Sequence, residues 1–158
     1  MNFEIKKLSE ESSAAVEEIE KLCFSHPWSE STVSSEIKSG FSDFFGAFCE
    51  GELAGYIGGR TICGETEIFN VAVDPKFRRK GIADALIKKF IEAVREKETR
   101  VIFLEVRTSN LGAISLYEKN GFVFCGIRKD YYTDPKENAL LMRLAFDGTQ
   151  EFEEWDDE

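Results

Sequence analysis

The sequence predicts a mixed α/β fold of the α+β type, in which helices flank a mostly antiparallel sheet that contains one parallel pair of strands. The first observation is a run of three apolar segments, 41–50, 53–62 and 66–73, separated only by tight turns, which is typical of an antiparallel meander. The second is an amphipathic helix over 82–97, which precedes a nearly continuous apolar strand at 101–107. Such a strand–helix–strand crossover makes its two strands parallel, with a right-handed connection.

Before the meander, the sequence predicts one strand and two helices. Residues 3–8 alternate between apolar and polar side chains, as in a strand with one covered face. Ser9 is a candidate N-cap for the first helix, and Pro27 ends that helix. Either Ser29 or Ser31 can cap the second. The apolar stripes consist of Ala15, Ile19, Leu22 and Cys23 in the first helix and Val33 and Ile37 in the second.

After the parallel strand, Asn110 caps a further helix that Asn120 and Gly121 end. Two strands, 122–128 and 139–146, then complete the sheet. Residues 1–146 therefore form a single domain. Residues 147–158 are rich in acidic side chains and poor in apolar ones, which predicts a disordered tail.

Composition narrows the class of protein further. A chain of 158 residues with 42% hydrophobic content can build one substantial core. No stretch reaches the roughly 18 apolar residues of a membrane span, and the N-terminus lacks the features of a secretory signal. Four scattered cysteines without metal-ligand spacing predict buried, reduced thiols and a cytoplasmic protein with no metal site. These cysteines are Cys23, Cys49, Cys63 and Cys125.

Net charge indicates the kind of partner. The chain carries a formal charge of −10, which argues against nucleic-acid binding and favours attraction of basic proteins. We expect a monomer or weak dimer that acts on such a partner.

The loop between the meander and its following helix is a candidate anion site. Arg78, Arg79 and Lys80 stand just before a helix start, where unpaired N–H groups and the helix dipole already favour negative charge. Gly81 allows the backbone to approach a ligand closely, so a pyrophosphate fits this loop. Neither the P-loop nor the dinucleotide-binding glycine motif occurs in the chain. The alternative is a solvated basic turn.

Two side chains could take part in acid–base chemistry. Glu105 lies in a strand that, as a parallel strand, should be covered on both faces, and loss of solvent would make its carboxylate a better base near neutral pH. The alternative is a strand-end Glu paired with Arg107 or a lysine. Tyr117 lies on the following helix, where it is either a core residue or a proton donor. The only histidine, His26, adjoins Pro27 and is expected at the surface.

Several motifs resemble one family. The loop, as Arg78-x-x-Gly81-x-Ala83, resembles the R/Q-x-x-G-x-G/A loop of the GNAT superfamily of N-acetyltransferases. Within it, the chain most resembles the bacterial ribosomal-protein-alanine N-acetyltransferases of the RimI type, over residues 3–146. The runs that carry this resemblance are Leu104 to Asn110, the A-I-x-L-Y-E-x-x-G-F run that contains Tyr117, Arg128-x-x-Tyr131-Tyr132, Ala139-x-x-Met142 and Pro27-Trp28-Ser29.

The resemblance implies a fold, a cosubstrate and residue roles. It implies the GNAT fold with a splayed parallel strand pair, acetyl-coenzyme A as cosubstrate, Glu105 as general base and Tyr117 as general acid. Arg78 and Ala83 stand where Gln and Gly are common in the family, within the allowed alternatives. The implied cofactor contacts are the backbone of Val71, Ala72 and Val73 for the pantetheine arm, Arg78, Arg79, Lys80, Gly81, Ile82, Ala83 and Asp84 for the pyrophosphate, and Asn110 near the thiol.

The expected reaction is direct transfer of acetyl to an amine. An α-amine has a pKa of about 8, against about 10.4 for lysine, so one carboxylate acting through water can supply the deprotonation it needs. A strand-end amide left unpaired by the splay could stabilise the oxyanion. We expect the N-terminal alanine of a small-subunit ribosomal protein as acceptor, with Trp28, Tyr131 and Tyr132 as the wall that faces the peptide. The alternatives are a broader N-terminal, lysine or small-amine acetyltransferase, and a coenzyme A-binding regulator without turnover.

Overall fold

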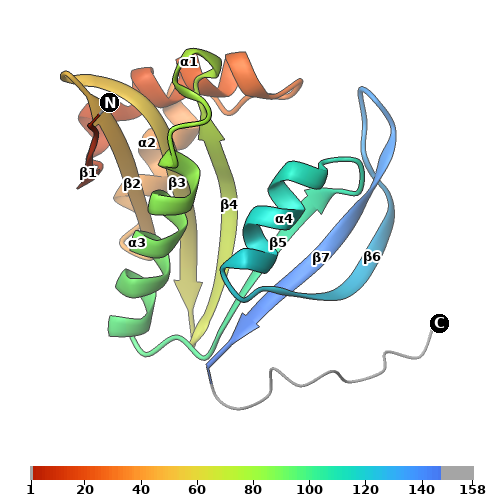
Figure 1. Ribbon diagram of the computed structural model, residues 1–158. Helices are drawn as coiled ribbons and strands as arrows, with labels where there is room; N and C mark the ends of the chain where they lie inside the picture. The colour runs from red at the N-terminus through yellow and green to blue at the C-terminus, as the bar shows by residue number, and fades with distance from the viewer. Residues whose placement is uncertain (1, 147–158) are drawn as a thin grey trace.

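A computed structural model describes residues 2–146, which form one seven-stranded mixed sheet with helices on both faces (Figure 1). The strand order is β1-β2-β3-β4-β5-β7-β6. The predicted acidic tail at 147–158 lies outside the described residues. The elements are β1 (Glu4–Lys7), a 3-10 turn η1 (Glu10–Ser12), α1 (Ser13–Cys23), α2 (Glu30–Lys38), β2 (Ser42–Cys49), β3 (Glu52–Ile62), β4 (Glu65–Val73), a 3-10 turn η2 (Pro75–Phe77), α3 (Ile82–Glu96), β5 (Val101–Arg107), α4 (Leu111–Lys119), β6 (Val123–Tyr132) and β7 (Glu137–Ala145).

The predicted fold class is confirmed. Strands β2, β3 and β4 pair as an antiparallel meander, and the crossover through α3 makes β4 and β5 parallel. Strand β7 returns antiparallel beside β5, with β6 at the edge of the sheet. None of the helices in the part of the chain that the structure describes is long and apolar enough to span a membrane.

The parallel pair is joined at one end only. Three residue pairs connect β4 to β5, the last of them Glu67 opposite Phe103. Beyond it the two strands diverge (Figure 1), and β5 stays paired along its length with β7. A register shift in the β3–β4 pairing coincides with this point, because Gly58 lies opposite Asn70 and Gly59 opposite Ile68. The joined end is held by a buried hydrogen bond of 2.7 Å between the hydroxyls of Thr66 and Thr99.

Helices cover the two faces of the sheet unequally. Helix α3 crosses β2, β3 and β4 on one face, and α1 and α2 cover the other face of the same strands. The approach of α3 is close, because a Cβ on Gly59 would lie 2.5 Å from the Phe90 ring and 2.5 Å from the Glu67 carbonyl oxygen. Along β5, burial alternates between buried Leu104 and exposed Phe103. Only one face of β5 is therefore covered, and the prediction that Glu105 lies in a strand covered on both faces is wrong.

Several local predictions also need correction. Helix α1 begins at Ser13, after η1, and the Ser9 side chain forms no capping bond. The buried stripe of α1 contains Glu20, whereas Leu22 is exposed. Cys63 is exposed because it occupies the β3–β4 turn with a φ of 52°. By contrast, the predicted caps Ser29 and Asn110 do accept backbone N–H bonds, from Thr32 and Ala113, at 3.2 Å each.

Candidate active site

A cavity of about 1020 Å³ opens where β4 and β5 diverge. Its walls come from the end of β3 and the turn after it, from β4, β5, β6 and β7, and from the loop between α1 and α2, so segments far apart in the sequence meet there. It contains four of the residues singled out from the sequence: Glu105, Trp28, Tyr131 and Tyr132. The remaining lining residues are Arg60, Ile62, Cys63, Glu65, Thr66, Glu67, Ile68, Phe69, Asn70, Phe103, Leu104, Cys125, Gly126, Ile127, Arg128 and Leu141.

Of the three carboxylates that line this cavity, Glu105 is the one on β5, and its side chain is 21% exposed. Its Oε1 lies 3.3 Å from Nε of Arg128, which faces it from β6. The Tyr131 hydroxyl hydrogen-bonds the same carboxylate, and this bond is the main reason why the pKa of Tyr131 rises to about 12. The predicted alternative of a pair with Arg107 or a lysine is therefore wrong in its partner, because Arg107 bonds Glu137 instead at 3.3 Å.

The hairpin between β6 and β7 is fixed beside the cavity by Arg107. Its guanidinium donates to the carbonyl oxygens of Pro135 at 2.8 Å and Thr133 at 3.1 Å. The same group lies 4.4 Å from the Tyr132 ring centroid, and the Tyr131 and Tyr132 rings meet edge to face with centroids 5.0 Å apart. Arg107, at the end of β5, thus positions the two tyrosines that line the cavity.

The α1–α2 loop forms the facing wall through Trp28. The ring of Trp28 packs on Phe69 of β4 with centroids 5.1 Å apart, and its backbone N–H donates to Oε1 of Glu20 at 3.4 Å. Trp28 therefore lines the cavity, as predicted, and also anchors the loop to α1 and β4. His26 is exposed, as expected, and it contacts the hairpin at 3.0 Å from both the Thr133 hydroxyl and the Asp134 carboxylate.

Tyr117 does not line this cavity. It is buried, 7% exposed, and packs edge to face on Phe122 with centroids 5.8 Å apart. Burial raises the pKa of Tyr117 well above its ordinary value, and the neighbouring Tyr132 adds to the effect. The hydroxyl therefore keeps its proton at neutral pH, and Tyr132 is the residue near both Tyr117 and Glu105.

The loop before α3 has the backbone of an anion cradle. Arg79 and Gly81 both have left-handed conformations, with φ values of 65° and 77°. Nothing lies within 4 Å of the position where a Cβ on Gly81 would stand, so its conformation, rather than crowding, requires glycine. Within residues 2–146, no backbone carbonyl accepts from the first N–H groups of α3, those of Ile82, Ala83 and Asp84. The loop can therefore offer bare amides to an anion.

The side chains around this cradle have distinct partners. The guanidinium of Arg78 turns back to β4, where Nε donates to the Val73 carbonyl at 3.2 Å. Asp84 accepts from Asn120 at 2.9 Å and from Lys88 at 2.5 Å, and these bonds lower the pKa of its carboxyl. Only the amide of Asp84 is thus left for an anion.

Strand β4 exposes a free edge above its contact with β5. The N–H of Asp74 donates to Ala54 of β3, and peptide groups alternate in direction along a strand. Those of Val71 and Val73 consequently point to the open edge, whereas that of Ala72 points to β3. The Val73 carbonyl already accepts from Arg78 and from the Cys23 thiol, so Val73 has its N–H left for a ligand. Asn110, at the start of α4, uses its side-chain oxygen for the helix cap.

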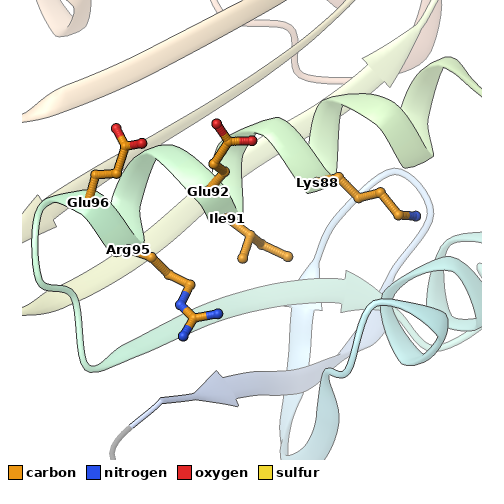
Figure 2. Close-up of a pocket in the computed structure, with 5 residues that line it drawn as sticks. All are labelled: Lys88, Ile91, Glu92, Arg95 and Glu96. Carbon is orange, nitrogen blue, oxygen red and sulfur yellow. The ribbon is translucent and has the colours of Figure 1, made fainter.

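A second hollow, along α3, is shown in Figure 2. One helix supplies all its lining residues, and their charges have both signs. Its lining comes from a single helix, without a second wall, so it does not compete with the cavity between β4 and β5. The lining residues are Lys88, Ile91, Glu92, Arg95 and Glu96. No group of three or more metal-ligating side chains occurs among the residues described.

Glu20 and Asn70 are among the polar residues of the site that were not singled out from the sequence. Glu20 is fully buried behind the cavity wall, where its Oε1 accepts from Nδ2 of the cavity residue Asn70 at 3.0 Å. Burial is the main reason why the pKa of Glu20 rises to about 7. The available signal was a charged residue beside Ile19 in the apolar stripe of α1.

Comparisons with known proteins agree with this architecture. Residues 13–122 match the sequence model of the Acetyltransferase (GNAT) family. The chain is 37% identical over 128 residues to the putative [ribosomal protein bS18]-alanine N-acetyltransferase of Bacillus subtilis, covering 80% of this chain and 85% of that protein. It is 36% identical to the Escherichia coli K12 [ribosomal protein bS18]-alanine N-acetyltransferase, with coverages of 80% and 86%. The crystal structure of the Escherichia coli ribosomal-protein-S18-alanine N-acetyltransferase superposes with a TM-score of 0.85 and 32% identity, over 96% of this chain and 100% of that one.

Proposed function

The chain belongs to the GNAT acetyltransferase family and is an N-acetyltransferase, and on this premise we propose that it transfers acetyl from acetyl-coenzyme A to the α-amine of a protein N-terminus. The acceptor that we propose is the N-terminal alanine of the small-subunit ribosomal protein bS18, the substrate named for its relatives. The observation that carries the proposal is the position of Glu105, in a cavity at the divergence of β4 and β5.

Two parts of the chain fit the cosubstrate. The pyrophosphate would be held by the positively charged loop of Arg79, Lys80 and Gly81 and by the amides that begin α3, from which no described backbone carbonyl accepts. The pantetheine amides would pair with the open edge of β4 at Val71 and Val73. Arg78 shapes the loop through its bond to the Val73 carbonyl. Asn110 lies at the start of α4, near the proposed thiol end.

The acceptor amine would enter from the cavity side. Glu105 would take a proton from the α-ammonium, directly or through a water molecule. The nitrogen lone pair then attacks the thioester carbon, and a peptide N–H left unpaired at the divergence of the strands can stabilise the oxyanion that forms. When the carbon–sulfur bond breaks, the Tyr117 hydroxyl would give its proton to the departing thiolate. The second proton that leaves the nitrogen would restore the Tyr117 hydroxyl through water, and Glu105 would release the first proton to solvent. No covalent enzyme intermediate is needed.

An α-amine suits this cavity better than a lysine side chain. Its pKa of about 8 lies near neutral pH, so one carboxylate suffices as base, whereas lysine, near 10.4, needs more assistance. Trp28, Tyr131 and Tyr132 supply the aromatic walls around the acceptor. Glu65 and Glu67 of β4 also line the cavity and form no ion pair with another described residue. Their negative charge would attract basic residues that follow the N-terminal residue of the acceptor protein.

A peptide panel tests the proposal. We would incubate the protein with acetyl-coenzyme A and peptides that carry a free N-terminal alanine, a blocked N-terminus with an internal lysine, or a different first residue. Mass spectrometry would locate the added acetyl group. We expect it on the α-amine of the alanine peptide. Acetylation of lysine alone would support the lysine acetyltransferase, and cofactor binding without transfer would support the regulator.

The state of the protein in the cell is part of the same proposal. We propose a cytoplasmic enzyme, monomeric or weakly dimeric, that meets its basic protein substrate without binding nucleic acid or membrane. The net charge of −10 supports attraction of a basic protein. Size-exclusion chromatography with light scattering would measure the oligomeric state.

A further inference from the structure

Asn70 is a polar side chain on the β4 wall of the cavity that the proposed reaction does not use. It lies close to the point where β4 leaves β5, as does Glu105 on the facing strand. Its Nδ2 donates a hydrogen bond of 3.0 Å to Oε1 of Glu20. Among the described residues, Oδ1 accepts no hydrogen bond, and the Tyr56 hydroxyl, which also lies beside this amide, is a partner of its nitrogen. The amide is therefore held by its nitrogen, and its oxygen is left to accept.

Glu20 is an unusual partner, because its carboxylate is 0% exposed inside α1. Its Oε1 also accepts from the backbone N–H of Trp28 at 3.4 Å, so it connects two walls of the cavity. The Tyr56 hydroxyl lies near the carboxylate, yet Oε2 has no hydrogen-bond partner among the described residues. A buried carboxylate with an unpartnered oxygen costs stability. Departures of this kind from good core design are expected at functional sites.

We propose that Asn70 binds the acceptor and that Glu20 is its positioning residue: by holding Nδ2, Glu20 presents Oδ1 to the cavity, where it accepts an N–H of the acceptor's N-terminal residue. This inference rests on the proposed function. Oε1 of Glu20 already accepts from the Trp28 N–H, so this oxygen acts as an acceptor whether or not Oε2 carries a proton, and it can bind only the nitrogen arm of the amide. It thereby selects which arm of Asn70 faces the substrate. Glu105 then acts on the amine while Asn70 orients the residue that carries it.

The geometry also predicts which replacement of Glu20 is tolerated. In Glu20→Gln, the Trp28 N–H still requires an oxygen at the position of Oε1, so that oxygen continues to accept from Asn70. In Glu20→Leu, both bonds are lost and the amide of Asn70 is free to turn. A purely structural role would make the two variants differ in stability without a change in peptide affinity.

The test measures peptide binding separately from turnover. The probe is a short synthetic peptide with a free N-terminal alanine followed by basic residues, titrated by calorimetry into protein saturated with coenzyme A. We expect Asn70→Ala and Glu20→Leu each to raise the Kd for the peptide about tenfold, as for loss of one hydrogen bond. The double variant should be no worse than either single one, and Glu20→Gln should stay near wild type. Affinity for acetyl-coenzyme A should not change.

A matched control replaces another buried carboxylate. Asp43 is 2% exposed and bonds Lys97 at 2.7 Å on β2, so Asp43→Asn should leave the peptide Kd unchanged. An unchanged Kd in Asn70→Ala, additive losses in the double variant, or a loss in Glu20→Gln equal to that in Glu20→Leu would each overturn the inference. If Glu20→Leu does not fold, Asn70→Ala and Glu20→Gln decide it. A wild-type protein that binds the peptide without acetylating it would refute the proposed function. The peptide Kd values of the variants would still show whether Asn70 binds the acceptor.

Discussion

Replacement of Glu20 by Gln tests whether the buried carboxylate behind the cavity is as poorly solvated as its environment indicates. Burial raises the pKa of Glu20 from 4.5 to about 7 in the folded protein. The folded state then holds this proton more tightly than the unfolded chain does. Stability from this group is thus fully present below pH 4.5 and is lost as the pH rises through about 7. At about 1.4 kcal/mol per pH unit, the loss amounts to about 3 kcal/mol.

Glu20→Gln removes the titration and keeps the oxygen that Trp28 and Asn70 need. The free energy of unfolding of this variant, relative to wild type, should rise by about 2 to 3 kcal/mol between pH 5 and pH 8. Urea unfolding monitored by circular dichroism at a series of pH values measures the free energy of unfolding of both proteins. The contributions of the other carboxylates are the same in the two proteins and cancel in the difference. The matched control is Glu18→Gln on the same helix, where the carboxylate is 72% exposed and its removal should leave the pH dependence of wild type. A difference between Glu20→Gln and wild type that is constant from pH 5 to pH 8 would refute the reasoning.

Three further predictions concern the reaction. Glu105→Gln should lower turnover at pH 7 by about a hundredfold and cost less at high pH, where the amine is already free; an unchanged pH–rate profile would remove Glu105 from the role of base. Tyr117→Phe should lower kcat with little effect on the KM for acetyl-coenzyme A, and a change in that KM alone would reassign Tyr117 to binding. Arg79→Gly removes the guanidinium without strain at a φ of 65°, and calorimetry should show weaker acetyl-coenzyme A binding by about threefold to tenfold; wild-type affinity would contradict the proposed cradle.

The sequence was sufficient for the fold because its apolar periodicity is strong and its turns are short. The meander, the crossover through α3 and the caps at Ser29 and Asn110 all follow from local patterns that the tertiary structure keeps. The end of β6 does not follow from such a pattern. Residues 129–132 are polar and aromatic, and they join the strand because Asn138 accepts from the Asp130 N–H and Tyr132 pairs opposite Glu137.

The site was less predictable, since its decisive contacts join residues distant in sequence. Glu105 and the aromatic walls could be singled out from motifs, but the partner of Glu105 could not, because Arg128 reaches it from a strand two places away in the sheet order. Glu20 was not singled out from the sequence, where it is one of 30 acidic residues. Only the packing of α1 against β3 and β4 shows that its carboxylate lies inside.

In the proposed reaction, Glu105 accepts the proton of a protein α-amine in the cavity between β4 and β5. The most direct test follows acetyl transfer by mass spectrometry for wild type and Glu105→Gln across a range of pH, using a peptide with a free N-terminal alanine and an internal lysine. We predict a single acetyl group on the α-amine, at a rate that Glu105→Gln lowers most near neutral pH. Acetyl found on the lysine, or equal rates for the two proteins at pH 7, would contradict the claim.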